Sequence, residues 1–70
     1  MKWFKQRRVE WIIEMAAIYG YINRDHIRRK FGVSTPQASL DIADALSQTS
    51  HLQYDRSGKR YVWTGPAEEN

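Results

Sequence analysis

The chain has 70 residues and a formal net charge of +3, a length that suits one small domain with a modest core. It contains no cysteine, which excludes a disulfide framework and a zinc site made of thiolates and favours a cytoplasmic protein. Glu10 and Glu14 interrupt the apolar pattern near the amino end, so the sequence predicts neither a signal peptide nor a membrane-spanning segment.

The eleven lysines and arginines fall into three clusters along the sequence. The clusters are Lys2, Lys5, Arg7 and Arg8; Arg24, Arg28, Arg29 and Lys30; and Arg56, Lys59 and Arg60. Residues 31–55 contain none of them and carry Asp41, Asp44 and Asp55 instead. A negatively charged partner would therefore be contacted mostly from outside that stretch.

A helix from about Phe4 to Tyr19 is the first predicted element, and Gly20 is expected to end it. Apolar residues with helical spacing form a stripe that would face the core, namely Val9, Ile12, Ile13, Ala16 and Ala17. A second apolar line lies roughly opposite, formed by Phe4, Trp11, Met15 and Ile18. We interpret this second line as an interface with a second copy or another protein; alternatively, strands of a later hairpin cover part of it.

Residues 21–22 are too few for an independent strand and are predicted to pair as a third strand with a later hairpin. Asn23 is the expected N-cap of a second helix that runs from Arg24 to Phe31. Gly32 suits a left-handed end to this helix. The next helix follows so soon that the two must cross steeply.

The segment FGVSTPQASLDIADAL predicts the start of that third helix. Ser34 lies three residues before Gln37, the spacing of a capping box in which each side chain bonds the backbone of the other residue. Alternatively, Thr35 is the cap and Pro36 takes the first helical position. The helix is expected to run from Thr35 to about Ser47. The side chains expected to face inward are Ala38, Ile42, Ala45 and Leu46.

Residues 52–63 change to the alternating pattern of β-strands, with Ser57-Gly58 as a turn. The positions that alternate with polar ones are Leu52, Tyr54, Tyr61 and Trp63. This pattern predicts a β-hairpin whose aromatic face packs on the helices, because a lone hairpin is marginal in water. The domain is expected to span residues 1–64, and residues 65–70 to form a disordered tail.

This order of elements predicts a mainly α fold with a small β-hairpin (α+β), a winged helix-turn-helix of three helices plus a C-terminal wing. In such a domain the amino end of the third helix enters the DNA major groove. The predicted base-contacting residues are Thr35, Pro36, Gln37, Ser39 and Leu40. Gln37 is expected to bond adenine bidentately, and the alternative is that it only completes the cap.

The residues predicted to contact the DNA backbone are Ser34, Arg24, Arg28, Arg56, Lys59 and Arg60. Ser34 would act through the backbone N–H groups at the helix start, and the basic residues would act from the second helix and the hairpin tip. Asp41 is expected to face Arg28 or Arg29 of the second helix, and Asp44 to be solvated.

Three stretches resemble the N-terminal winged-helix domain of DeoR-like bacterial regulators, especially those followed by a WYL domain: FGVSTPQASLDI, INRDHIRRKFG and YDRSGKRYV. They are similar to the reading helix, second helix and wing of that family. The resemblance implies a dimeric cytoplasmic transcription repressor. It also implies groove-facing roles for Ser34, Thr35, Gln37 and Ser39, and backbone contacts from Arg56 and Lys59. Those regulators continue into a ligand-sensing domain, so the chain is expected to be either a fragment or a stand-alone head.

The leading hypothesis is a sequence-specific transcription regulator that binds double-stranded DNA as a homodimer. The alternative is a protein–protein interaction module that uses the second apolar line of the first helix. An enzyme is not expected, because His26 and His51 are the only histidines and the residues assemble no persuasive catalytic triad or metal site. No cofactor, membrane partner or small-molecule ligand is predicted for this chain.

Overall fold

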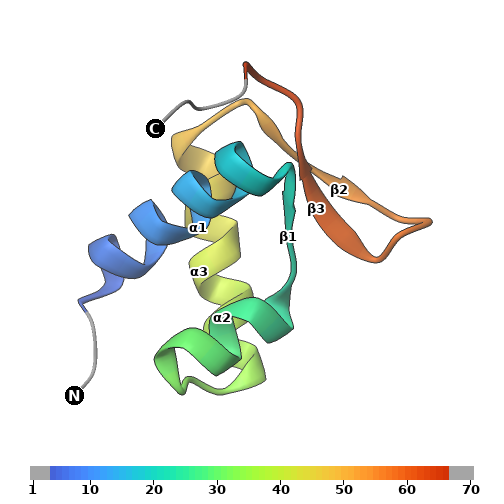
Figure 1. The fold of residues 1–70 in the computed structure, drawn as a ribbon. Helices are drawn as coiled ribbons and strands as arrows, with labels where there is room; N and C mark the ends of the chain where they lie inside the picture. The colour runs from blue at the N-terminus through green and yellow to red at the C-terminus, as the bar shows by residue number, and fades with distance from the viewer. Residues whose placement is uncertain (1–3, 67–70) are drawn as a thin grey trace.

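The computed structural model describes residues 4–66, in which the chain forms three helices and a three-stranded antiparallel sheet (Figure 1). The elements in chain order are α1 (Lys5–Tyr19), β1 (Tyr21–Ile22), α2 (Arg24–Phe31), α3 (Thr35–Gln48), β2 (Leu52–Asp55) and β3 (Arg60–Trp63). The predicted α+β arrangement of helices and wing is therefore confirmed. Each helix in the described range is too short or too polar to cross a membrane.

The short strand β1 joins the hairpin to the helices. Gly20 ends α1 with φ 90°, a left-handed conformation that glycine adopts without a steric penalty. The chain then enters β1, which pairs antiparallel with β3, so the strand order is β1-β3-β2. The predicted third strand at residues 21–22 is confirmed. Through it the hairpin is fixed beside the helices (Figure 1).

The corner between α2 and α3 is stabilised by side-chain caps and a glycine. The Asn23 side chain accepts from the backbone N–H of His26 at 3.0 Å, and His26 Nδ1 accepts from the Asn23 N–H at 3.3 Å, which confirms the predicted cap. Gly32 ends α2 with φ 66°, as predicted. Ser34 caps α3 by accepting from the backbone N–H of Gln37 at 3.3 Å. The start of α3 is therefore held by bonds within the corner itself.

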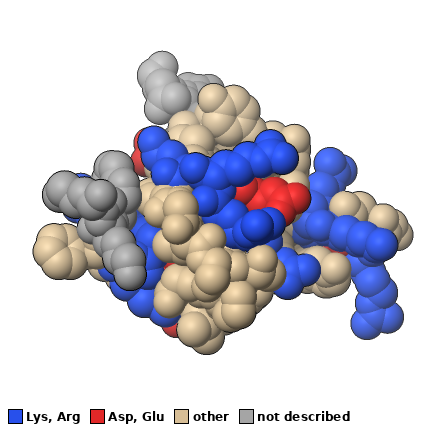
Figure 2. Space-filling model, turned by 90° about the horizontal axis from the view of Figure 1, so that it is seen from below, with Lys and Arg blue, Asp and Glu red and all other residues tan. Residues whose placement is uncertain are grey.

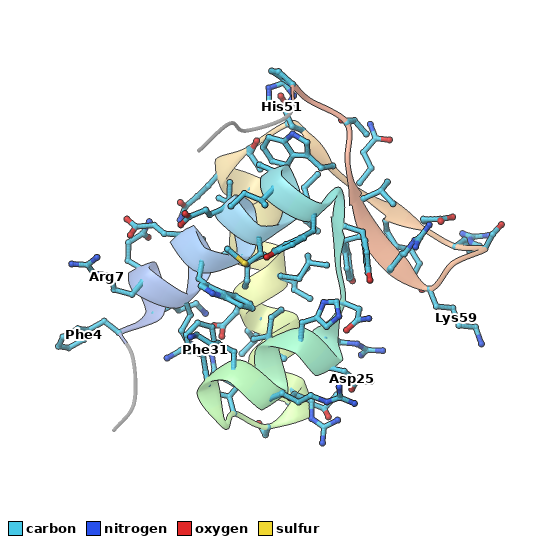
Figure 3. All side chains as sticks on the ribbon, in the orientation of Figure 1. Phe4, Arg7, Asp25, Phe31, His51 and Lys59 are labelled. Carbon is cyan, nitrogen blue, oxygen red and sulfur yellow. The ribbon has the colours of Figure 1, made fainter. Side chains whose placement is uncertain are left out.

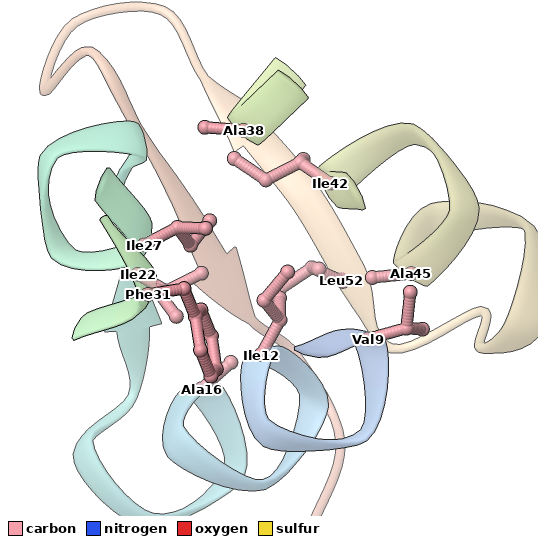
Figure 4. Packing of buried hydrophobic residues seen from close by; sticks show 10 residues of the cluster. All are labelled: Val9, Ile12, Ala16, Ile22, Ile27, Phe31, Ala38, Ile42, Ala45 and Leu52. Carbon is pink, nitrogen blue, oxygen red and sulfur yellow. The ribbon is translucent and has the colours of Figure 1, made fainter. Parts of the chain in front are cut away.

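The core lies between the helices and the inner face of the sheet (Figure 4). Its buried apolar residues are Val9, Ile12, Ala16, Ile22, Ile27, Phe31, Ala38, Ile42, Ala45 and Leu52. Ile13, predicted to face inward, is only partly buried and packs against this cluster. The prediction that Leu46 faces inward is wrong: it is 37% exposed, because it lies about 100° around the helix from the buried Ala45.

The second apolar line of α1 is partly covered by α2. The Trp11 ring meets the Phe31 ring edge to face with centroids 5.2 Å apart, and the Lys30 ammonium lies 6.0 Å from the Trp11 centroid. Met15 packs against the core cluster, whereas Phe4 is 83% exposed. The cover over Trp11 thus comes from α2, and the part of the line nearest the amino end is open to solvent.

The tip of the hairpin is the four-residue turn 56–59, which contains the predicted Ser57-Gly58. The positive φ in this turn, 53°, belongs to Lys59. Behind the tip, the Tyr54 and Tyr61 rings are 4.9 Å apart between centroids. At the other end, the Trp63 indole N–H donates to the Pro66 carbonyl at 2.8 Å. Of the tail predicted at residues 65–70, residues 67–70 lie outside the described part of the chain.

Candidate nucleic-acid interface

The amino end of α3 is open to solvent. The exposed residues along its first turns are Ser34, Thr35, Pro36 and Leu40, the last with 56% of its surface accessible. Gln37 and Ser39 are half-buried on opposite sides of this surface, because residues two apart in sequence lie about 200° apart around a helix. A binding partner that contacts Pro36 would therefore have Gln37 on one side of the contact and Ser39 on the other.

On the Gln37 side, a buried ion pair joins α1 to α3. Asp41 is 0% exposed, and its Oδ2 accepts from Arg8 Nε at 2.7 Å while its Oδ1 accepts from Arg8 Nη2 at 3.2 Å. Oδ1 also accepts from Gln37 Nε2 at 2.9 Å. Lys5 Nζ lies 3.7 Å from Oδ1 of Asp41 and 3.0 Å from Oδ2 of Asp44. A buried carboxylate needs such partners, since burial without them costs several kcal/mol.

The predicted environment of the two α3 aspartates is wrong. Asp41 faces Arg8 of α1 rather than Arg28 or Arg29, because it lies on the α1 side of α3 while α2 lies on the Ser39 side. Asp44 is half-exposed but pairs with Lys5 instead of being only solvated.

The predicted capping box is half right. Ser34 caps the helix, so the alternative cap at Thr35 is wrong, and Pro36 stands in the first turn. Gln37 supplies the backbone N–H that Ser34 accepts, but its side chain donates to Asp41 instead of returning to the cap. A carboxylate only accepts hydrogen bonds, and because it is charged, an amide N–H bonds it more strongly than it bonds a neutral acceptor. The buried carboxylate of Asp41 is within reach of the Gln37 side chain and therefore binds its NH₂.

Arg8 and Lys5 were not singled out from the sequence as site residues, yet a signal for Arg8 exists there. Asp41 stands between Ala38 and Ala45 in the inward stripe of α3, and Arg8 stands four residues before the buried Ile12 of α1. A charged residue at an inward position in each of two helices indicates a buried pair, because neither charge is tolerated there alone.

On the Ser39 side, the contact comes from α2 and is exposed. Arg24 Nη1 donates to Ser39 Oγ at 3.4 Å, so the structure brings a predicted backbone-contacting residue beside a predicted base-contacting one. Arg28 Nη1 lies 3.0 Å from Oδ1 of Asp25, and both side chains of this pair are about half exposed. Arg24 of α2 therefore lies directly at the edge of α3, whereas Arg28 of α2 is paired with Asp25.

The three basic residues predicted on the wing differ in their surroundings. Arg56 and Lys59 are exposed in the turn, and Figure 3 shows Lys59 projecting from the tip. The Arg60 guanidinium instead lies 4.9 Å from the Tyr21 ring centroid, and its Nε is 3.8 Å from Oδ2 of Asp55. Arg60 is thus directed back over the sheet, while the other two extend from it.

Basic side chains gather on the face that carries α2 and the helix corner. Figure 2, seen from below the view of Figure 1, shows lysines and arginines running across this face and continuing over the hairpin on the right. Acidic atoms are visible among them. The basic clusters of α2 and of the hairpin are therefore presented together, rather than on unrelated sides.

A separate apolar hollow lies between α1, β1 and α2. The residues that line it include Trp11, Met15, Tyr19, Tyr21, Arg29 and Lys30. Of the predicted partner surface, Trp11 and Met15 belong to this hollow, whereas Phe4 and the half-buried Ile18 do not. Within residues 4–66, no group of three histidine, aspartate or glutamate side chains is arranged to hold a metal ion.

Comparison with known proteins matches residues 5–66 to the BrxR transcriptional regulator winged helix-turn-helix domain, which confirms the predicted kind of domain. The chain is 41% identical over 61 residues to the DNA-binding transcriptional repressor CapW of Pseudomonas aeruginosa. It is 38% identical over 61 residues to CapW of Escherichia coli strain KTE188. Each alignment covers 86% of this chain but 20% of the relative, so the chain spans a fifth of the length of these curated relatives.

Proposed function

Because the chain belongs to the family of the BrxR transcriptional regulator winged helix-turn-helix domain, we propose that it represses transcription by occupying a specific sequence in double-stranded DNA. The observation that carries the proposal is the exposed amino end of α3, which adjoins the basic residues of α2 on the same molecular face as those of the wing. Both CapW relatives are DNA-binding transcriptional repressors, which supports the same role. On the resemblance of its motifs, we propose that it is related to the N-terminal winged-helix domain of DeoR-like regulators, especially those followed by a WYL domain.

In the proposed complex, the start of α3 lies in the major groove, where each base pair presents a distinct set of donors and acceptors. The base-contacting residues are Thr35, Pro36, Gln37, Ser39 and Leu40. Gln37 bonds adenine, and the exposed Leu40 or Pro36 touches a thymine methyl group. Exposure of Thr35, Pro36 and Leu40 at the helix start, with Gln37 and Ser39 half-buried beside them, supports the assignment.

Phosphate contacts surround this reading surface. The proposed backbone-contacting residues are Ser34, Arg24, Arg28, Arg56, Lys59 and Arg60. Ser34 marks the helix start, where backbone N–H groups and the helix dipole favour an anion. Arg56 and Lys59 extend from the wing toward the backbone or the minor groove, while Arg60 reaches phosphate only if it leaves the Tyr21 ring.

We further propose a cytoplasmic homodimer in which the apolar hollow contacts α1 of the second copy. The hollow has Arg29 and Lys30 in its lining, and α1 carries Glu14 three residues after Trp11, on the same side of the helix. A two-fold arrangement then pairs each acidic side chain with the basic lining of the other copy. Glu14→Lys is expected to shift the protein toward monomer in analytical ultracentrifugation. Gln53→Lys, at an exposed position of β2 outside the hollow, is the control, and equal effects of both variants would contradict this interface.

DNA binding is tested first by selecting duplexes from a random pool and then by measuring affinity for the selected sequence across salt concentrations. Neutralising about 4–6 phosphates per subunit predicts a log–log slope of about −4 to −5 per subunit. Enrichment of one sequence together with this slope supports the proposal. Failure to enrich any sequence, or a slope near zero, contradicts it.

The second candidate is a protein-interaction module, favoured by the apolar hollow and by the absence of lysine and arginine from residues 31–55. Random-sequence duplex DNA separates the two candidates. A repressor retains weak, salt-sensitive binding to it, whereas a module that only binds protein shows none.

A further inference from the structure

The contact between Gln37 and Asp41 fixes which way the Gln37 amide faces. A carboxylate only accepts hydrogen bonds, so the group of Gln37 that points at Asp41 must be the NH₂, as the 2.9 Å contact from Nε2 to Oδ1 has it. The carbonyl Oε1 is bonded to the same carbon and therefore points away from Asp41. In a glutamine without such a neighbour, the two ends of the amide interchange by rotation.

The Asp41 carboxylate is itself fixed. Two nitrogens of the Arg8 guanidinium contact its two oxygens, at 2.7 Å and 3.2 Å, which is the fork geometry that allows little rotation of either group. Asp41 has no exposed surface and Arg8 is 8% exposed, so water does not loosen the pair as it does on a protein surface. The orientation imposed on Gln37 thus originates in α1, 33 residues away in sequence from Asp41.

We propose that Arg8 and Asp41 are positioning residues for base recognition, which act by presenting Gln37 to the groove with its carbonyl and one N–H outward. This inference rests on the proposed DNA-binding function. An amide NH₂ has two hydrogens, and one of them serves Asp41. The second hydrogen and Oε1 are the donor and acceptor that a bidentate contact with adenine N7 and N6 requires. The bond to Asp41 is therefore compatible with reading adenine and selects the amide orientation that does so.

Ser39, on the other side of the reading surface, offers a contrast. Its partner Arg24 is exposed, the contact is 3.4 Å long, and a hydroxyl both donates and accepts. After accepting from Arg24, the Ser39 hydroxyl still has a hydrogen to donate and a second lone pair to accept, so this contact does not fix which of the two it offers to a base. We therefore expect stronger discrimination between bases at the base pair that Gln37 contacts than at the base pair near Ser39.

The test replaces the ion pair without leaving a buried charge. The double variant Arg8→Met with Asp41→Leu keeps apolar volume between α1 and α3, and such replacements of buried pairs are often neutral for stability. We expect it to bind the selected duplex while its discrimination at the Gln37 base pair falls, by less than the roughly 5- to 150-fold loss expected for Gln37→Ala. Adding Gln37→Ala to the double variant is then expected to remove the remaining preference at that base pair. Asp44→Asn, on the same helix, is the control and is expected to retain the preference.

The outcomes separate this inference from the proposed function. Unchanged discrimination in a folded double variant overturns the positioning role and leaves DNA binding intact. If the wild-type protein selects no sequence at all, the proposed function fails, and the inference fails with it.

A second measurement needs no variant. In the free wild-type protein, NMR relaxation of side-chain amides is expected to give Gln37 a higher order parameter than Gln53, an exposed glutamine of β2. Equal, low order parameters for the two side chains would show that Gln37 is not held before DNA arrives, and the proposal would be wrong even if the double variant does not fold.

Discussion

The start of α3 and the tip of the hairpin are the two regions proposed to contact DNA, and they differ in charge and in how their side chains are held. Residues 31–55 contain no lysine or arginine, and Gln37 is bonded to the buried Asp41. The tip carries Arg56 and Lys59, both exposed. Under the proposed function, the first region supplies base selectivity through uncharged side chains, of which Gln37 is held by Asp41, and the second supplies salt-dependent affinity.

Stability is where the two regions are expected to differ most. Arg8→Ala leaves the Asp41 carboxylate buried without its partner, and the free energy of unfolding should fall by about 3–5 kcal/mol. Arg60→Ala, which removes the half-exposed pair with Asp55 on the wing, should cost about 1 kcal/mol or less. Urea denaturation followed by circular dichroism measures both. Similar losses in the two variants would contradict the contrast.

Base selectivity is the next largest expected difference. Gln37→Ala should reduce discrimination at one base pair by about 1–3 kcal/mol and leave the other positions of the site unchanged. Binding to a set of duplexes with single substitutions measures this. Gln48→Ala, at the other end of the same helix, is the control and should leave every position unchanged. A uniform loss for Gln37→Ala would show that this residue only supports the helix start.

Two serines, Ser34 at the start of α3 and Ser57 in the wing turn, allow the stability of the two regions to be compared through smaller substitutions. Ser34 caps α3 through its side chain, so Ser34→Ala should destabilise the domain by about 1 kcal/mol. Ser57 in the wing turn instead donates its backbone N–H to Asp55, at 3.1 Å, and this bond survives Ser57→Ala. The second variant should stay within about 0.5 kcal/mol of wild type in thermal or urea unfolding. The order of the two losses would be reversed if the wing turn, rather than the cap, depended on its hydroxyl.

The smallest expected effect is that of one wing charge. Arg56→Ala should weaken binding to all duplexes alike and lower the log–log salt slope by about 1, because one phosphate contact is lost. Fluorescence anisotropy at several salt concentrations measures the slope. A change confined to one base pair would assign Arg56 to base contact and remove the division between the two regions.

The elements could be predicted from the sequence where local signals bound them. α2 begins and ends at the predicted residues because Asn23 caps it and Gly32 ends it, and both signals act within a few residues. The start of α3 follows in the same way from Ser34. The prediction that Leu46 faces inward fails because helical spacing alone does not determine how wide the buried stripe is at the end of a helix.

The contacts around the candidate site could not be predicted in the same way. Whether Asp41 faces α1 or α2 depends on how the helices pack, which local spacing does not determine, and Arg8 is 33 residues distant in sequence. The same packing decides that Lys30 and Phe31 cover Trp11. The sequence predicts that Gln37 lies at the helix start, but the partner of its side chain depends on the pair between Asp41 and Arg8, which the sequence does not predict.

Lys59 holds a backbone conformation that favours glycine, with φ 53°. For a residue with a Cβ this geometry costs about 1–2 kcal/mol, so Lys59→Gly would relax the turn while removing a cation from its tip. Selection for thermal tolerance alone would drive position 59 toward glycine. A lysine retained at this position in spite of the strain would indicate a trade-off: the wing turn loses some conformational stability, and the positive charge of Lys59 strengthens binding to DNA.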